Sequence, residues 1–346
     1  MTERPIPLSI RVRLAHALAQ RVADEHGVDL LHVKGPAVDP ALRDPGRSGT
    51  DVDVLVRPPH LDTFVAALAD LGWERYSEFE TGSPFEHAAN YWHSDWGYID
   101  VHREFPGFQA DPQTVFDRLW ADRQTLPIAA RDCQVPGRIG QALVLLLHAA
   151  RDESRGTTEV PRIWSALDTP GATGTDGTAH IADTAGQEAV RALAAELGST
   201  VALAAALGEL DQHRGARDYA LWAAYSQGGS RFDKAIGRVK AEPTLRGKAR
   251  AALHAVPVNT DALAMRLGRA PTRAEVAQEF GYRVWLGMRD GSRAVAGSVR
   301  ERLDRSDAPD RGPRLPGHRQ SRLAGLAGRL RCGRDAAPPP ESGEPR

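Results

Sequence analysis

The chain has 346 residues, of which 41% are hydrophobic and 26% are charged, and its formal net charge is −1. This length is sufficient for two domains with their own cores. A net charge this close to zero excludes a global field that would select nucleic acid or an anionic membrane as the main partner.

Two features of the sequence indicate where the protein works. The N-terminal stretch is charged throughout and contains no apolar segment of signal-peptide length. The two cysteines, Cys133 and Cys332, lie far apart in the sequence. A reduced, cytoplasmic protein is the simplest interpretation of both features.

The first part of the chain predicts a small mixed α/β unit. Apolar spacing over residues 8–26 predicts an amphipathic helix. Residues 27–35 (GVDLLHVKG) predict a strand between two glycines. After a loop rich in Pro and Gly, residues 51–56 (DVDVLV) predict a second strand. Residues 59–73 then predict a helix with Gly72 as its C-cap.

Two aromatic-rich segments follow, HAANYWHSD and GYIDVHREF, and they meet around residues 94–97. Short strands joined by a Gly-containing turn are typical of a β-hairpin. The first ~130 residues therefore run helix, strand, loop, strand, helix, strand, strand.

From Gly137 onward the pattern is helical. The most apolar run, residues 139–150, is too short to cross a bilayer and predicts a buried helix. Residues 168–180 contain few apolar side chains and predict a flexible loop. The predicted helices are 138–151, 158–168, 187–197, 200–211, 215–226, 230–254 with a break at Pro243, 258–268 and 272–304.

The C-terminal segment has a different composition. Residues 311–334 carry seven arginines and no acidic residue, which predicts a disordered tail, or alternatively a basic arm for nucleic acid. We expect an α+β protein: a small mixed-sheet domain at residues 1–130, an all-helical domain at 136–305 and an Arg-, Pro- and Gly-rich tail at 306–346.

Two aspartates stand at the start of the second predicted strand. Residues i and i+2 of a strand point to the same face, so Asp51 and Asp53 project side by side, about 6–7 Å apart at the backbone. Like charges this close repel, and a divalent cation such as Mg²⁺, or Mn²⁺, removes the penalty. Aspartates at a strand's start also cap neighbouring loops, so the pair alone leaves both interpretations open.

A third carboxylate lies in the second strand of the predicted hairpin. Asp100 shares a face with His102, while Ile99 and Val101 share the other face. A buried unpaired carboxylate is costly, so Asp100 needs a partner or a cation. Three carboxylates from two strands can bind two metal ions that clamp an in-line phosphoryl transfer. His102 could orient a metal-bound water or an acceptor, or could be a hydrogen-bonded structural histidine.

The end of the first predicted strand carries the third feature. Gly35 allows the backbone to approach a ligand closely. Backbone N–H groups of the following turn could hold phosphates, and Lys34 or Arg47 could neutralise them.

Together, LHVKGPAV, GRSGTDVDVLV and YIDVHREF resemble the uncharacterised nucleotidyltransferase family of the polymerase-β-like superfamily. In that family a Lys-Gly pair ends the first strand, an Arg-x-x-x-Asp-hydrophobic-Asp segment starts the second, and a hydrophobic-Asp-hydrophobic-His segment follows. The match covers roughly residues 25–105 and extends weakly through ALVLLLHAARD and RIWSALD.

The resemblance implies a nucleotidyltransferase fold and transfer of a nucleoside monophosphate from an NTP to an acceptor, with release of pyrophosphate. Asp51 and Asp53 would hold both metals, and Asp100 would bind the metal at the acceptor and help to deprotonate it. The nucleotide-binding residues implied are Lys34, Gly35, Arg47 and Ser48. The acceptor, a small molecule, a peptide or a protein side chain, is not identified.

Two departures from the family pattern and two rival functions stay open. Pro36 stands where the superfamily has Gly or Ser, which removes an N–H donor, and the gap from Gly35 to Asp51 is long. An Asp-x-Asp pair also binds Mn²⁺ and a nucleotide-sugar in glycosyltransferases. A degenerate module that only binds a partner, like an antitoxin, is the non-enzymatic alternative.

Overall fold

The computed structural model describes residues 6–44, 46, 49–82, 85–167, 185–255, 263, 267, 271–282, 285 and 289. All of them belong to one compact unit, Met1–Val295. Arg47, Ser48, the predicted loop at 168–180, most of the helix at 258–268 and the tail at 306–346 lie outside the described residues.

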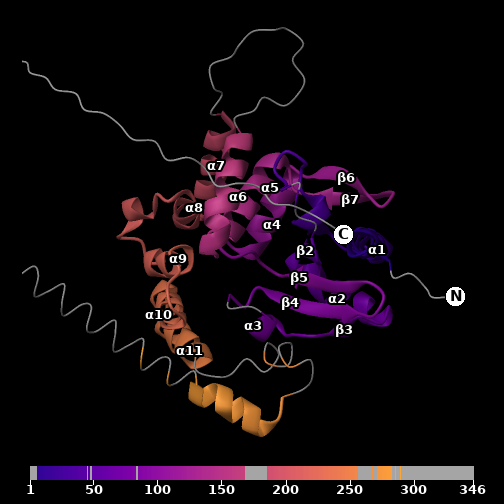
Figure 1. Cartoon of the computed structure of the whole chain (residues 1–346). Helices are drawn as coiled ribbons and strands as arrows, with labels where there is room; N and C mark the ends of the chain where they lie inside the picture. The colour runs from indigo at the N-terminus through magenta and orange to yellow at the C-terminus, as the bar shows by residue number, and fades with distance from the viewer. Residues whose placement is uncertain are drawn as a thin grey trace, which may run out of the picture. The chain divides into compact units, whose positions relative to one another are not determined.

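A five-stranded mixed sheet forms the first part of the chain (Figure 1). The central strands β2 and β5 run parallel, and every other neighbouring pair is antiparallel. The predicted hairpin is present as β4 and β5, with His93 opposite Gly97. In the order in which they lie across the sheet, the strands are β1 (Leu30–His32), β2 (Val52–Val56), β5 (Gly97–His102), β4 (Ala88–His93) and β3 (Glu74–Arg75).

Two helices cover one face of this sheet. The first is α1 (Leu8–His26), as predicted, and it ends at Gly27, whose φ of 64° is left-handed. The second is α2 (Leu61–Asp70), which follows the short 3-10 helix η2 (Pro58–His60). Alternate strand residues pack against these helices in one core, which includes Val52, Val54, Val56, Phe64, Ile99 and Val101. The even-numbered valines therefore take the core side of β2, which leaves Asp53 on the other side.

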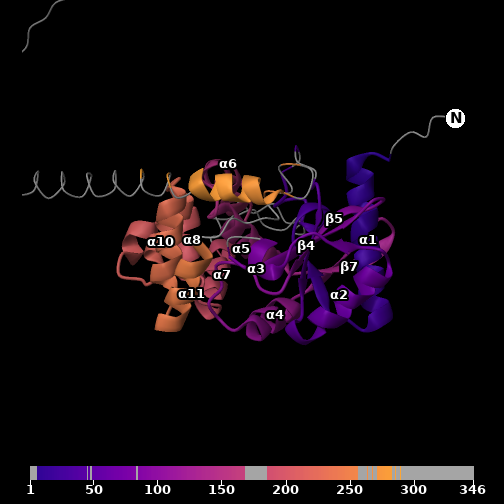
Figure 2. The same ribbon diagram turned by 90° about the horizontal axis from the view of Figure 1, so that it is seen from below.

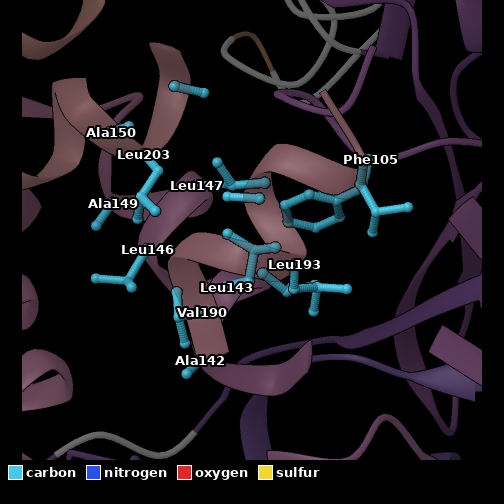
Figure 3. Packing of buried hydrophobic residues seen from close by; sticks show 14 of the residues in the cluster. Phe105, Ala142, Leu143, Leu146, Leu147, Ala149, Ala150, Val190, Leu193 and Leu203 are labelled. Carbon is cyan, nitrogen blue, oxygen red and sulfur yellow. The ribbon is translucent and has the colours of Figure 1, made fainter. Parts of the chain in front are cut away.

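The opposite face of the sheet packs against the helical region. Leu55 of β2 and Phe105 after β5 share a core with α5 (Arg138–Ala149). Figure 3 shows Phe105 beside Leu143, Leu147 and Leu193. The predicted buried helix at 139–150 is thus confirmed. The neighbouring helices are α6 (Glu153–Ala166), α7 (Ala185–Glu196) and α8 (Thr200–Leu207).

The later helices follow the predicted order. The predicted break at Pro243 is confirmed, because it separates α10 from α11, which lie side by side (Figures 1 and 2). The predicted helix at 158–168 begins earlier, at Glu153, because the Asp152 side chain caps it by accepting from the Ser154 N–H. The elements are η3 (Leu210–His213), α9 (Tyr219–Ser226), α10 (Arg231–Ala241) and α11 (Leu245–Ala255).

The sequence patterns did not predict several elements before residue 136. These are α3 (Phe79–Gly82), α4 (Pro112–Ala121), β6 (Gln124–Ile128) and β7 (Arg131–Val135). The β6–β7 hairpin turns at Ala129 and Ala130, which both have positive φ. Alanine rarely takes this conformation, so the Asn-Gly signal of such a turn is missing from the sequence. The predicted α+β class is confirmed, and no helix of the described residues is long and apolar enough to span a membrane.

We expect Phe64→Ala to lower the free energy of unfolding by about 3–5 kcal/mol, because it empties a fully buried ring position between α2 and the sheet. Urea unfolding followed by circular dichroism measures the loss. Leu71→Ala, at a residue that is 46% exposed just after α2, is the control and should cost less than about 0.5 kcal/mol. Equal losses in both variants would contradict this account of the core.

Candidate active site

The parallel pairing of β2 with β5 places two carboxylates on neighbouring strands. Asp53 and Asp100 are direct partners in the strand register. One ligand atom each of Asp53, Asp100 and His102 lie within 4.8 Å of one another. The structure therefore brings together two of the three predicted carboxylates and the predicted accessory histidine.

Asp53 is almost fully buried and is held by two side chains. The Lys34 ammonium and the His102 Nε2–H both donate to its Oδ1, the latter at 2.9 Å. Burial acts to raise the pKa of Asp53, but the Lys34 charge and the His102 hydrogen bond outweigh it and lower the pKa below its usual range. Asp53 is therefore the ionised centre of the site.

His102 acts on Asp53 as a neutral imidazole. Burial lowers its pKa, although the hydrogen bond to Asp53 opposes the shift. Since Nε2 donates to an ionised carboxylate, Nε2 carries the proton and Nδ1 carries the lone pair. Within the part of the chain that the structure describes, the buried Nδ1 has no hydrogen-bond partner.

Asp100 behaves differently from Asp53. Burial, together with the negative charges of Asp53 and Asp51, raises the pKa of Asp100 to about 7. The Asn90 side chain donates to its Oδ1, and Asn90 is held in turn by Ser77, whose hydroxyl donates to the Asn90 Oδ1 at 2.6 Å. Asp100 is thus a carboxyl group that exchanges a proton near neutral pH.

Asp51 lies at the edge of this group. It directly precedes β2, and its Oδ1 accepts from the Thr50 hydroxyl at 3.3 Å. It is not a member of the three-residue cluster, but burial and the Asp53 charge raise its pKa. The structure therefore places Asp51 close enough to interact electrostatically with Asp53 and Lys34, although it lies outside the 4.8 Å cluster.

The predicted phosphate-binding turn approaches the strand that carries the aspartates. Gly35 has a φ of 61°, which only glycine adopts without strain. A Cβ on Gly49 would lie 3.2 Å from the Gly35 Cα, so the loop before Asp51 packs backbone to backbone on the turn. The Ala37 and Val38 N–H groups donate within the turn, at 3.3 Å to the Lys34 and Gly35 carbonyls. Fewer turn N–H groups therefore remain for phosphate than the sequence predicts.

Three residues near the carboxylates were not predicted. Asn90 lies opposite Asp100 in the β4–β5 register, three positions along from the His93–Gly97 pair that closes the hairpin, so counting outward from the turn would have placed it there. His87 stacks near His102, with ring centroids 5.1 Å apart. Arg151 follows α5 and reaches His87, with a nitrogen-to-nitrogen distance of 3.3 Å. His87 and Arg151 give no local signal, because only tertiary packing brings them to the sheet.

The donor set fits a divalent cation. Two carboxylates with oxygens within 4.8 Å suit Mg²⁺ or Mn²⁺, and His102, whose Nε2–H is engaged with Asp53, would orient that carboxylate. A positive ion would also relieve the repulsion that raises the Asp100 pKa.

A separate cavity of about 450 Å³ lies between α5, α6, α8 and α9. Its lining includes Gly156, Thr157 and Ala206 but none of the predicted site residues. The carboxylate cluster and this cavity are therefore separate features of the fold.

Three solved structures are similar to this chain. One is the lincosamide antibiotic adenylyltransferase LnuA bound to lincomycin, at 19% identity over 44% of this chain and 96% of that chain, with a TM-score of 0.31. Another is an antigenic nucleotidyltransferase-like protein from Paracoccidioides brasiliensis, at 21% identity over 58% and 95%, with a TM-score of 0.34. The third is the antibiotic-resistance factor ANT(2'')-Ia, at 16% identity over 60% and 94%, with a TM-score of 0.32.

No curated protein matches the chain. A family model does match it, over residues 12–208, which is more than half of its length. The matched segment contains β1, β2 and β5 and continues through α5 to α8. The protein belongs to the uncharacterised nucleotidyltransferase family.

Proposed function

We propose that the protein is a Mg²⁺- or Mn²⁺-dependent nucleotidyltransferase that moves a nucleoside monophosphate from an NTP to an acceptor. The observation that carries this proposal is the pair Asp53 and Asp100. They lie side by side on parallel strands, and the pKa of Asp53 is lowered while that of Asp100 is raised. An ionised carboxylate beside one that exchanges its proton near pH 7 is the combination that metal binding and base catalysis both need.

Asp53 and Asp100 would hold the metal, with Asp51 as the further carboxylate at the edge. When bound, Mg²⁺ or Mn²⁺ supplies positive charge that polarises the phosphoryl oxygens. His102 positions Asp53 through the 2.9 Å hydrogen bond, so we assign it an orienting role.

In the proposed reaction, a nucleophilic oxygen or nitrogen of the acceptor attacks the α-phosphorus. The bond from that phosphorus to the bridging oxygen of the pyrophosphate breaks, and pyrophosphate leaves with the bonding electrons. Asp100 accepts the proton of the nucleophile, since a bound cation would relieve the repulsion that raises its pKa and so keep the group ionised.

Lys34 and Gly35 are the proposed phosphate-contact residues from the end of β1. The Lys34 ammonium pairs with Asp53 in this structure. A metal bound at Asp53 would compete for the same oxygen, which frees Lys34 to contact phosphate. Arg47 and Ser48 complete the proposed nucleotide-binding set, and the domain at 136–305 would shape the acceptor side.

We expect Asp53→Asn to abolish metal-dependent NTP binding, with at least a 100-fold rise in Kd, because it removes the carboxylate whose pKa is held below its usual range. Isothermal titration calorimetry with the four NTPs and with UDP-sugars, with and without Mg²⁺ or Mn²⁺, measures this. Asp70→Asn, at an exposed position at the end of α2, is the matched control and should bind like the wild type.

The same titration separates the rival functions. Binding of UDP-sugars in place of NTPs would favour a glycosyltransferase. No nucleotide binding by the wild type would contradict nucleotidyl transfer and favour a binding module.

We expect Asp100→Asn to stabilise the metal-free protein more at pH 8 than at pH 5. The pKa of Asp100 is about 7 in the folded chain, above its ordinary value, so the folded state binds the proton more tightly than the unfolded state. Stability is therefore lost as pH rises toward the folded pKa, and asparagine removes the loss. Thermal melting in EDTA should show a gain of at least about 1 kcal/mol at pH 8. A gain that does not depend on pH would refute this pKa.

A further inference from the structure

A half-buried arginine stands next to the carboxylates and has no part in the roles assigned so far. Arg151 lies just after α5, and its side chain is directed toward the sheet, where one guanidinium nitrogen is 3.3 Å from the His87 Nε2. The other terminal nitrogen donates to the His148 Nδ1. Its Cζ lies 5.4 Å from the ring centroid of Phe105 and 5.9 Å from that of Phe85.

The partners of Arg151 do not neutralise it. Burial lowers the pKa of His87 and of His148 well below the ordinary value, and the nearby Arg151 and Lys34 charges lower both further. Neither imidazole carries a negative charge that could balance the guanidinium, and a neutral His148 can accept from only one of its two neighbours, Arg151 and Arg155. Within the described part of the chain, Arg151 forms no ion pair with a carboxylate, whereas Arg155 pairs with Asp152 at 3.7 Å and with Glu159 at 3.8 Å.

This uncompensated cation is costly. Burial among aromatic rings lowers the pKa of Arg151 to about 10, against the opposing effect of Asp53. A desolvated charge without a counter-ion destabilises the protein unless something else offsets it. An anionic ligand would do so, and the planar guanidinium fork is well suited to phosphate oxygens.

The contacts connect Arg151 to the site. Asp53 accepts from His102 at 2.9 Å, the His102 and His87 rings lie 5.1 Å apart, and His87 contacts Arg151. Lys34 pairs with the same carboxylate. A phosphate chain bound at Asp53 would then lie between a cation from the sheet and a cation from the helical region.

We propose that Arg151 is a substrate-contact residue that binds a phosphate group of the NTP, opposite Lys34. This rests on the proposed nucleotidyltransferase function and names a further residue for it. If Arg151 binds phosphate, the helical region takes part in nucleotide binding as well as in acceptor binding.

The test measures binding to four proteins: wild type, Arg151→Gln, Arg151→Lys and Arg155→Gln. The ligands are the NTP that binds the wild type most tightly, tripolyphosphate and adenosine, all with Mg²⁺. We expect Arg151→Gln to weaken NTP and tripolyphosphate binding at least tenfold and Arg151→Lys to weaken it less. Arg155 also contacts His148 but already has carboxylate partners, so Arg155→Gln is the matched control. Its affinity for NTP and tripolyphosphate should stay within twofold of the wild type.

A labelling experiment on the wild type avoids any folding defect of the variants. Phenylglyoxal modifies accessible arginines, and mass spectrometry gives the rate at each position. The bound NTP should slow modification of Arg151 at least fivefold and leave the exposed Arg123 unchanged.

NTP affinity within twofold of the wild type in a folded Arg151→Gln variant would overturn the proposal and leave the acceptor as the partner of Arg151. Equal labelling of Arg151 with and without NTP would overturn it as well. A wild type that binds no NTP would instead defeat the proposed function itself, and this inference with it, so the two failures are distinguishable.

Discussion

The structure of the site depends on two carboxylates that are buried next to each other. Asp53 and Asp100 are register partners on adjacent parallel strands, so neither can move away from the other without breaking the sheet. Their repulsion is resolved unequally. Lys34 and His102 keep Asp53 ionised. Asp100, which is buried beside that negative charge, has a raised pKa as a result. The arrangement is suited to a cation, because a cation bound by both carboxylates would relieve the repulsion between them.

Neutral imidazoles surround this charged pair. His87 and His102 are buried and His148 is half-buried, and burial lowers the pKa of each. A protonated histidine would add a third positive charge beside those of Lys34 and Arg151. The neutral rings instead supply hydrogen-bond donors and acceptors that fix Asp53 and Arg151 in place. These hydrogen bonds therefore link the sheet to the residues that follow α5.

Much of the α/β part could be predicted from local patterns. Apolar periodicity predicts the helix at Leu8–His26 and the strand β2 that carries Asp53. Aromatic-rich strands around a glycine turn predict the β4–β5 hairpin. The β6–β7 hairpin could not, because Ala129 and Ala130 adopt positive φ without a turn residue to announce it. The start of α6 was missed because Asp152 caps the helix ahead of a weakly apolar first turn.

The sequence by itself determined which carboxylates share a strand face, because a strand alternates its side chains with a period of two. It also indicated the family, since the Lys-Gly pair, the Asp-x-Asp segment and the later Asp-x-His segment occur in the order that the family has. Only the tertiary structure decided that β2 and β5 pair in parallel, and hence that Asp53 meets Asp100 and that Asp51 stays at the edge. It alone brought Arg151 to the site, because contacts between residues far apart in the chain depend on how the helices pack on the sheet, which no local pattern encodes.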